Sequence, residues 1–117
     1  MPGPFAEGSI VVEIETGEPE RCLRFDPGAV DGQRWLHRLD RFDEVDAETA
    51  VERYALPAAE AYDVEVVEVP PGERLQVGTL APLNGREGGA DLVELSSRDA
   101  PPESWVVERT TLTSLLG

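Results

Sequence analysis

The chain has 117 residues, a length typical of one domain and too short for two ordinary ones. Its 24 acidic residues outnumber its 10 basic residues, all of them arginine, and the net charge is −14. Such a charge repels phosphate backbones, so we expect no binding to nucleic acid through net charge, and it favours a basic protein partner. Because only 6% of the residues are aromatic, we expect an aliphatic core.

The cysteine content and the distribution of apolar residues exclude several kinds of site and of targeting segment. A single cysteine, Cys22, rules out an internal disulfide, a Cys-rich zinc site and an iron–sulfur cluster. Residues 1–8 lack the basic and apolar regions of a signal peptide, and no apolar run reaches the length of a membrane span. We therefore expect no membrane contact. The expected location is the cytoplasm, or secretion as part of a toxin system without a classical signal peptide.

The first predicted element is a β-hairpin over residues 9–25. Apolar residues occupy every second position from Ile10 to Ile14, a turn sequence follows at 16–19, and the alternation resumes at Leu23. Two alternating runs separated by turn residues are typical of paired antiparallel strands.

A helix is predicted next, because apolar residues recur at i, i+1, i+4 and i+7 after a candidate N-cap at Asp31. The residues that we expect to be buried together against the sheet are Trp35, Leu36, Leu39 and Phe42. The polar face of this helix would carry Arg34, His37, Arg38 and Arg41. His37 is the only histidine, and without a second metal-ligating cluster we interpret it as a surface residue.

The second half of the chain predicts one short helix and several strands. The helix begins at Asp46 and ends before Pro57. A strand over 62–69 changes phase near its middle, which indicates a bulge or burial on both faces. The elements expected after it are a turn at 70–72, a strand at 75–79, a Gly-rich loop at 81–90, a strand at 91–95 and a strand or short helix within 104–116. Residues 1–117 are thus expected to form a single α+β domain, with a small mainly antiparallel sheet and one or two helices packed on it.

The Gly-rich loop is the most unusual feature of the sequence. Gly85, Gly88 and Gly89 permit backbone conformations that are closed to other residues. Consecutive backbone N–H groups in such a loop could form an anion nest, to which Arg86 would add a bidentate phosphate ligand. The alternative is a flexible hairpin loop without a ligand.

Five short segments follow one another in a characteristic order along the chain, and we call this series the ordered string. Composition alone explains Arg41 and Arg53 as ion-pair partners of neighbouring acids. The string consists of Leu39-Asp40-Arg41-Phe42, Arg53-Tyr54-Ala55-Leu56-Pro57, a Tyr-x-Val strand at Tyr62 to Val64, Val77-Gly78-Thr79-Leu80-Ala81-Pro82 and Gly85-Arg86-Glu87-Gly88-Gly89. Over about 32–95 this order resembles the tuberculosis-necrotizing-toxin (TNT) domain family, whose members are NAD(P)+ glycohydrolases.

The resemblance implies a site for NAD(P)+ as substrate or ligand, without another cofactor and without a metal. The ligand-binding residues that it implies are Arg41, Arg53, Tyr54, Gly85, Gly88 and Gly89. The two arginines would hold the pyrophosphate, and Tyr54 would face a base or the nicotinamide ring. Arg86 stands at the position of the family's catalytic glutamine, which implies weak or absent hydrolysis.

Three functions are compatible with these observations. The first is a divergent TNT-like NAD(P)+-binding domain, either a weak or an inactive glycohydrolase. The second is a non-enzymatic acidic interaction or immunity-type module that binds a basic protein partner. The third is a carboxylate-based hydrolase, but with 24 acids in the chain close carboxylate pairs are expected by coincidence.

Overall fold

A seven-stranded antiparallel sheet organises the protein in a computed structural model that describes residues 4–30 and 33–117. The strands are β1 (Val12–Glu15), β2 (Glu20–Asp26), β3 (Trp35–Arg38), β4 (Asp63–Val69), β5 (Arg74–Thr79), β6 (Asp91–Leu95) and β7 (Val106–Thr111). Their order across the sheet is β1-β5-β6-β3-β2-β4-β7. The described part of the chain adds two short helices, α1 (Ala47–Arg53) and α2 (Leu112–Leu116). The predicted α+β class with a mainly antiparallel sheet is confirmed.

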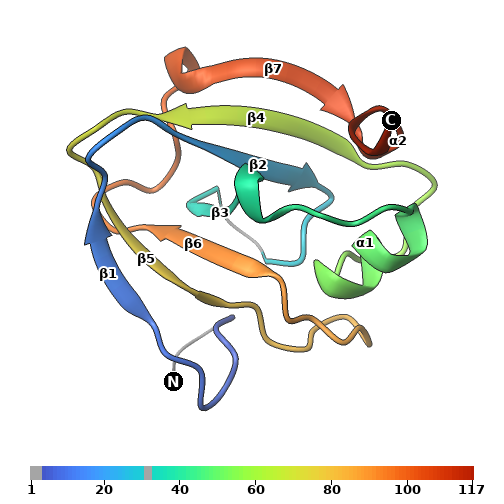
Figure 1. Cartoon of the computed structure of the whole chain (residues 1–117). Helices are drawn as coiled ribbons and strands as arrows, with labels where there is room; N and C mark the ends of the chain where they lie inside the picture. The colour runs from blue at the N-terminus through green and yellow to red at the C-terminus, as the bar shows by residue number, and fades with distance from the viewer. Residues whose placement is uncertain (1–3, 31–32) are drawn as a thin grey trace.

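The short strand β3 joins the two halves of the sheet. On one side it pairs with β2 through Cys22 opposite Arg38, and on the other with β6 through Leu36 opposite Val93. Figure 1 shows β2, β4 and β7 in the upper half of the molecule and β1, β5 and β6 in the lower half, with β3 between them. Two paired residues on each side of β3 thus hold the two halves of the sheet together.

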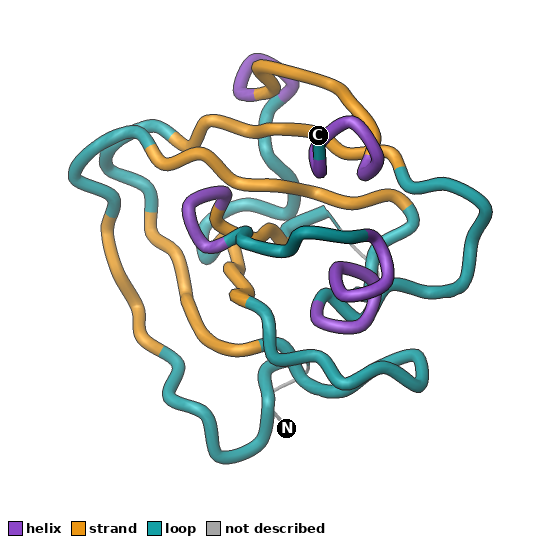
Figure 2. The backbone as a smooth tube through the Cα atoms, turned by 45° about the vertical axis from the view of Figure 1, so that its right-hand side comes forward, coloured by secondary structure: helices purple, strands orange, loops and turns teal. Residues whose placement is uncertain are grey.

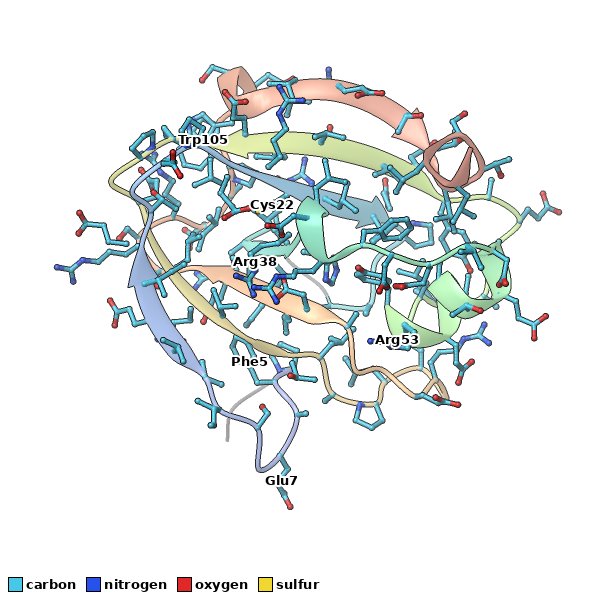
Figure 3. The ribbon with its side chains drawn as sticks, viewed as in Figure 1. Phe5, Glu7, Cys22, Arg38, Arg53 and Trp105 are labelled. Carbon is cyan, nitrogen blue, oxygen red and sulfur yellow. The ribbon has the colours of Figure 1, made fainter. Side chains whose placement is uncertain are left out.

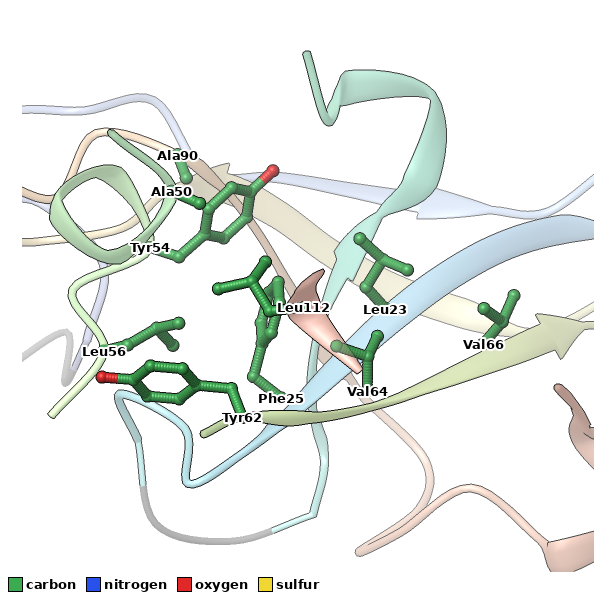
Figure 4. Close-up of a cluster of buried hydrophobic side chains, with 10 residues drawn as sticks. All are labelled: Leu23, Phe25, Ala50, Tyr54, Leu56, Tyr62, Val64, Val66, Ala90 and Leu112. Atoms are coloured by element: carbon green, nitrogen blue, oxygen red, sulfur yellow. The ribbon is translucent and has the colours of Figure 1, made fainter. Parts of the chain in front are cut away.

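Alternation along the strands produces apolar clusters on both faces of the sheet. The cluster in Figure 4 consists of Leu23, Phe25, Ala50, Tyr54, Leu56, Tyr62, Val64, Val66, Ala90 and Leu112. A second cluster consists of Cys22, Leu36, Val67, Val69, Leu75, Val93 and Leu95. Strand β4 contributes to both because its alternating side chains are buried on both faces of the sheet, which confirms the predicted burial on both faces; its register against β7 shifts between Val66 and Val67.

The helix predicted to begin at Asp46 is confirmed as α1. The Asp46 carboxylate accepts a hydrogen bond of 2.7 Å from the backbone N–H of Thr49, which is a typical N-cap. Figure 2 shows the helical segments in purple around the strands. Ala50 of α1 and Leu112 of α2 both belong to the first cluster, so the two helices cover the same part of the core.

The helix predicted over 31–42 is wrong where the structure describes it. Residues 35–38 form strand β3, and Leu39–Arg41 form a single 3-10 turn, η1; the predicted cap Asp31 lies outside the described residues. Leu36 is fully buried in the second cluster, whereas Leu39 and Phe42 pack on the first. These apolar residues therefore pack on opposite faces of the sheet, whereas the helical spacing predicted one common face.

The predicted hairpin over 9–25 is also wrong. Strand β1 pairs with β5, with Val12 opposite Val77, while β2 pairs with β3 and β4. Ile10, which was expected on an apolar face, is 82% exposed. Alternation identifies a strand but carries no information about its partner.

The remaining predicted elements are confirmed. Strands β5 and β6 occupy the expected ranges, and Gly72 has φ of +90° in the turn between β4 and β5. The tail contains both alternatives, because a 3-10 turn, η2 (Glu103–Trp105), leads into β7 and then α2. Among the described residues, none of the helices has the length and apolar character needed to cross a membrane.

Candidate functional site

Four consecutive backbone N–H groups of the Gly-rich loop, from Arg86 to Gly89, donate to other groups of the protein. Arg86 N–H donates to the Leu83 carbonyl at 2.8 Å, and Gly89 N–H donates to the Leu80 carbonyl at 2.9 Å. Between them, the N–H of Glu87 donates to the Glu52 carboxylate at 2.9 Å and that of Gly88 to the Glu52 carbonyl at 3.0 Å. Since all four donors have partners, the anion nest predicted at this loop is not formed.

Glycine is required at Gly88 by the fold. Its φ is +70°, and a Cβ there would lie 2.4 Å from the Ala81 carbonyl oxygen. Gly85 also has a positive φ, of +73°, but nothing lies within 4 Å of its Cβ position. Close approach of the loop to the preceding chain therefore explains Gly88 without a ligand.

The three arginines implied by the resemblance lie in different surroundings. Arg53 is exposed and donates to the Gly89 carbonyl at 3.3 Å, and Figure 3 shows it beside the loop. Arg86 donates to the Leu56 carbonyl at 3.1 Å and lies 3.8 Å from a Glu52 carboxylate oxygen, within a hollow of about 380 Å³ between α1 and α2. Arg41 is exposed, with its own neighbour Asp40 at 3.7 Å. No contact among the described residues joins Arg41 to the other two.

Tyr54 is a core residue rather than part of an open binding surface. It has no exposed surface, and its ring lies 5.2 Å from Phe25, 4.8 Å from His37 and 5.6 Å from Phe42, between centroids. Burial raises the pKa of its hydroxyl far above the usual range. In this structure Tyr54 holds η1, α1 and β3 together and faces no solvent.

The prediction that His37 lies on the surface is wrong. Its side chain is 6% exposed, and Nδ1 lies 2.6 Å from the Asp91 carbonyl oxygen. Because a carbonyl only accepts, Nδ1 carries the proton and Nε2 has a free lone pair. Burial lowers the pKa of the imidazole, so the ring is held neutral with a fixed tautomer.

A well-connected ion pair lies beside His37. The guanidinium of Arg38 contacts both carboxylate oxygens of Asp91, at 2.7 to 3.2 Å, and the same carboxylate accepts from the Arg38 backbone N–H at 2.9 Å. The hydrogen bonds to Asp91 raise the pKa of Arg38. Cys22 is paired directly with Arg38 across the sheet. Burial raises the pKa of its thiol to about 12, so this cysteine is unsuited to nucleophilic chemistry.

A cleft of about 980 Å³ lies between the ends of β2, β3 and β4. The aromatic residues among those that line it are Phe25, Trp35 and His37. At its rim, Arg24 and Arg109 both form ion pairs with Glu65. Other side chains that line it are those of Asp26, Pro57, Asp63 and Asn84. We call this cavity the β2–β4 cleft.

None of the implied ligand-binding residues lines the β2–β4 cleft, and sequence reasoning missed the residues that do. The sequence pointed to these lining residues only through the segments that lie next to them. Trp35 precedes the Leu39-to-Phe42 segment of the string, Pro57 ends the second segment, and Asn84 precedes the glycines. The string therefore marked the segments that approach the cleft, but not the side chains that face it.

Comparison with known proteins gives no further guide. No protein-family model, no curated protein and no solved structure matches this chain.

Proposed function

We propose that this protein is a divergent TNT-like domain that binds NAD(P)+ in the β2–β4 cleft, with weak or absent glycohydrolase activity. The observation that carries the proposal is that residues within or near the ordered string line one cavity. Pro57 and Val64 belong to the string, Trp35 precedes its first segment, and Asn84 directly precedes its glycine segment. These residues are far apart in the sequence, yet they line the same space.

The size and lining of the cleft suit a nucleotide. A volume of about 980 Å³ is at the upper end of the range for small-molecule sites, as a dinucleotide requires. The partly exposed Trp35 provides aromatic surface for a base, and Arg24 and Arg109 provide planar guanidinium groups for phosphates. Because Glu65 forms ion pairs with both arginines, a phosphate would have to displace or share this carboxylate.

Turnover is proposed to be slow, because Arg86, at the position of the resembled family's catalytic glutamine, lies outside the cleft. Cleavage of the N-glycosidic bond develops positive charge on the ribose, which carboxylates stabilise and guanidinium groups oppose. Asp26 and Asp63 are the cleft carboxylates free of arginine partners among the described residues. Arg86 lies in the separate hollow against Glu52 and Leu56, so we expect Arg86→Gln to leave both binding and turnover unchanged.

Calorimetric titration with NAD+ and NADP+, together with a nicotinamide-release assay, tests this proposal. Arg24→Gln and Arg109→Gln should each weaken binding by about 1–3 kcal/mol, the value of a hydrogen bond to a charged group. Arg21→Gln is the matched control, because Arg21 lies on the same strand and pairs with Glu68 outside the cleft. The absence of binding at millimolar nucleotide, or equal losses in all three variants, would contradict the proposal.

The proposal keeps the location expected from the sequence, either the cytoplasm or secretion with a toxin system. It also keeps the expectation that neither nucleic acid nor membrane is a partner. The alternative function, an acidic interaction module for a basic protein, draws on a different surface that is independent of the β2–β4 cleft.

A further inference from the structure

Strand β1 ends the sheet and leaves one side of its backbone unpaired. It pairs with β5 over Val12 to Glu15, and no other strand of the described chain pairs with it. In Figure 1 β1 is the outermost strand at the lower left, with β5 on its inner side. An unpaired strand edge presents N–H and C=O groups that can pair with another extended chain.

The hydrogen bonds near β1 identify which backbone groups point outward. The N–H of Thr16 donates to the Glu73 carbonyl at 2.9 Å, so Thr16 directs its backbone toward β5. Backbone direction alternates along an antiparallel strand, and Ile14 and Val12 therefore also bond inward. The N–H and C=O groups of Val11, Glu13 and Glu15 consequently face away from the sheet.

This edge also carries the longest run of exposed apolar side chains among the described residues. Ile10, Val11 and Val12 are 82%, 39% and 48% exposed, and they follow one another directly. Exposed apolar residues scattered singly need no explanation, but a contiguous run along an open edge is a feature that proteins usually avoid.

The charge around β1 defines the kind of partner. Four exposed acids, Glu7, Glu13, Glu15 and Glu18, surround the strand, and Arg74 is the nearby base, 3.8 Å from Glu13. A second copy of this chain would bring another net charge of −14 to the same place and would be repelled. An extended segment with lysine or arginine alternating with apolar residues complements both the charge and the exposed side chains.

We propose that the outer edge of β1 docks an extended, basic, alternating apolar segment of a partner protein, which extends the sheet as an eighth strand antiparallel or parallel to β1. Main-chain hydrogen bonds to Val11, Glu13 and Glu15 supply the affinity, and the surrounding acids select the charge. The occupant is a protein segment, and the edge acts independently of the β2–β4 cleft.

The opposite edge of the sheet, at β7, is less suited to this role. Val107 is exposed there at 46%, but it stands alone beside charged residues and at the point where the register against β4 shifts. Arg109, which is also on β7, forms ion pairs with Glu103 and Glu65. Charges and bulges are devices by which natural proteins prevent pairing at an edge.

The test uses the full chain and a set of nine-residue peptides in which valine alternates with lysine or arginine. Binding is followed by amide chemical shifts and hydrogen exchange. We expect shift changes and slower exchange confined to residues 10–16 and their β5 partners. A lysine–glycine peptide of equal charge should bind at least tenfold more weakly, because charge alone cannot fill the apolar side of the edge.

Two variants separate backbone pairing from side-chain contact. Glu13→Pro removes an outward N–H while leaving the inward bonds of β1, and it should reduce peptide affinity at least tenfold. Ile10→Thr should reduce affinity severalfold, whereas Val107→Thr, the matched change at the opposite edge, should not. Circular dichroism confirms that each variant is folded.

Four outcomes would overturn the proposal. These are no binding by any peptide of the set at 1 mM, shift changes centred on β7 or the cleft, full affinity in folded Glu13→Pro, and self-association through β1 detected by sedimentation. NAD(P)+ titration of Glu13→Pro should match the wild type, so failure at this edge is distinguishable from failure of the cleft proposal.

Discussion

At the scale of single residues, Asp91 connects strand β6 to two neighbouring residues of β3. Its carboxylate holds the Arg38 side chain and backbone, and its carbonyl fixes the His37 tautomer. The carboxylate side chain is 8% exposed and the arginine side chain 17%. Charges at this depth are tolerated because each one satisfies the other.

Removing the Asp91 carboxylate should be strongly destabilising. Asp91→Ala leaves Arg38 largely buried without its counter-ion, and loss of one partner from such a pair costs about 3–5 kcal/mol. Urea unfolding measures this loss. Asp99→Ala is the control, because Asp99 pairs with Arg34 at 2.5 Å but is 94% exposed, and exposed pairs contribute about 1 kcal/mol or less. Similar losses in the two variants would contradict this account of Asp91.

Glu44 gives a prediction about pH. Partial burial and a hydrogen bond with the Asp43 side chain raise the pKa of Glu44 to about 7. The folded state therefore keeps a proton that the unfolded state loses near pH 4.5, and ionisation at higher pH favours unfolding. Glu44→Gln, which stays neutral, should equal the wild type in stability at pH 4 and exceed it at pH 8. Urea unfolding at both pH values checks this, and a difference independent of pH would refute it.

At the scale of elements, the Gly-rich loop tests whether its glycines serve the fold. Gly88→Ala forces a side chain at positive φ into the Ala81 carbonyl, and we expect a loss of about 3 kcal/mol or more. Gly85→Ala meets open space and should cost about 1 kcal/mol from its backbone conformation alone. Thermal unfolding of both variants distinguishes the two cases. Equal losses would mean that the close approach to Ala81 is readily relieved.

The elements also show what the sequence could predict. Helix α1 and strands β4, β5 and β6 were predictable because their caps, turns and periodicity are local. Strand β3 was not, since the spacing of Trp35, Leu36 and Leu39 fits a helix, and long-range pairing with β2 and β6 overrides that preference. The cleft escaped prediction for a related reason. Arg24 and Arg109, at its rim, meet through Glu65 although they are distant in the sequence.

At the scale of the whole molecule, the net charge of −14 predicts how stability responds to salt. Acids outnumber bases 24 to 10, so repulsion among the acidic side chains outweighs attraction within the surface ion pairs. Salt should therefore relieve more repulsion than the attraction that it removes. Raising NaCl from 0.01 to 1 M shortens the screening length from about 30 to about 3 Å. We expect the melting temperature in calorimetry to rise by several degrees. A fall would show that the ion pairs dominate.

The pairing of β1 with β5 also has a consequence for synthesis on the ribosome. Val12 meets Val77, which is 77 − 12 = 65 residues later in the chain. At roughly 5–20 residues per second, translation takes roughly 3–13 s to supply this partner. Throughout that interval the nascent chain displays Ile10, Val11 and Val12 with neither edge of their strand paired. Strand β1 thus leaves the ribosome before the other strands of the sheet and waits longest for a partner, and during that interval it is exposed to chaperones.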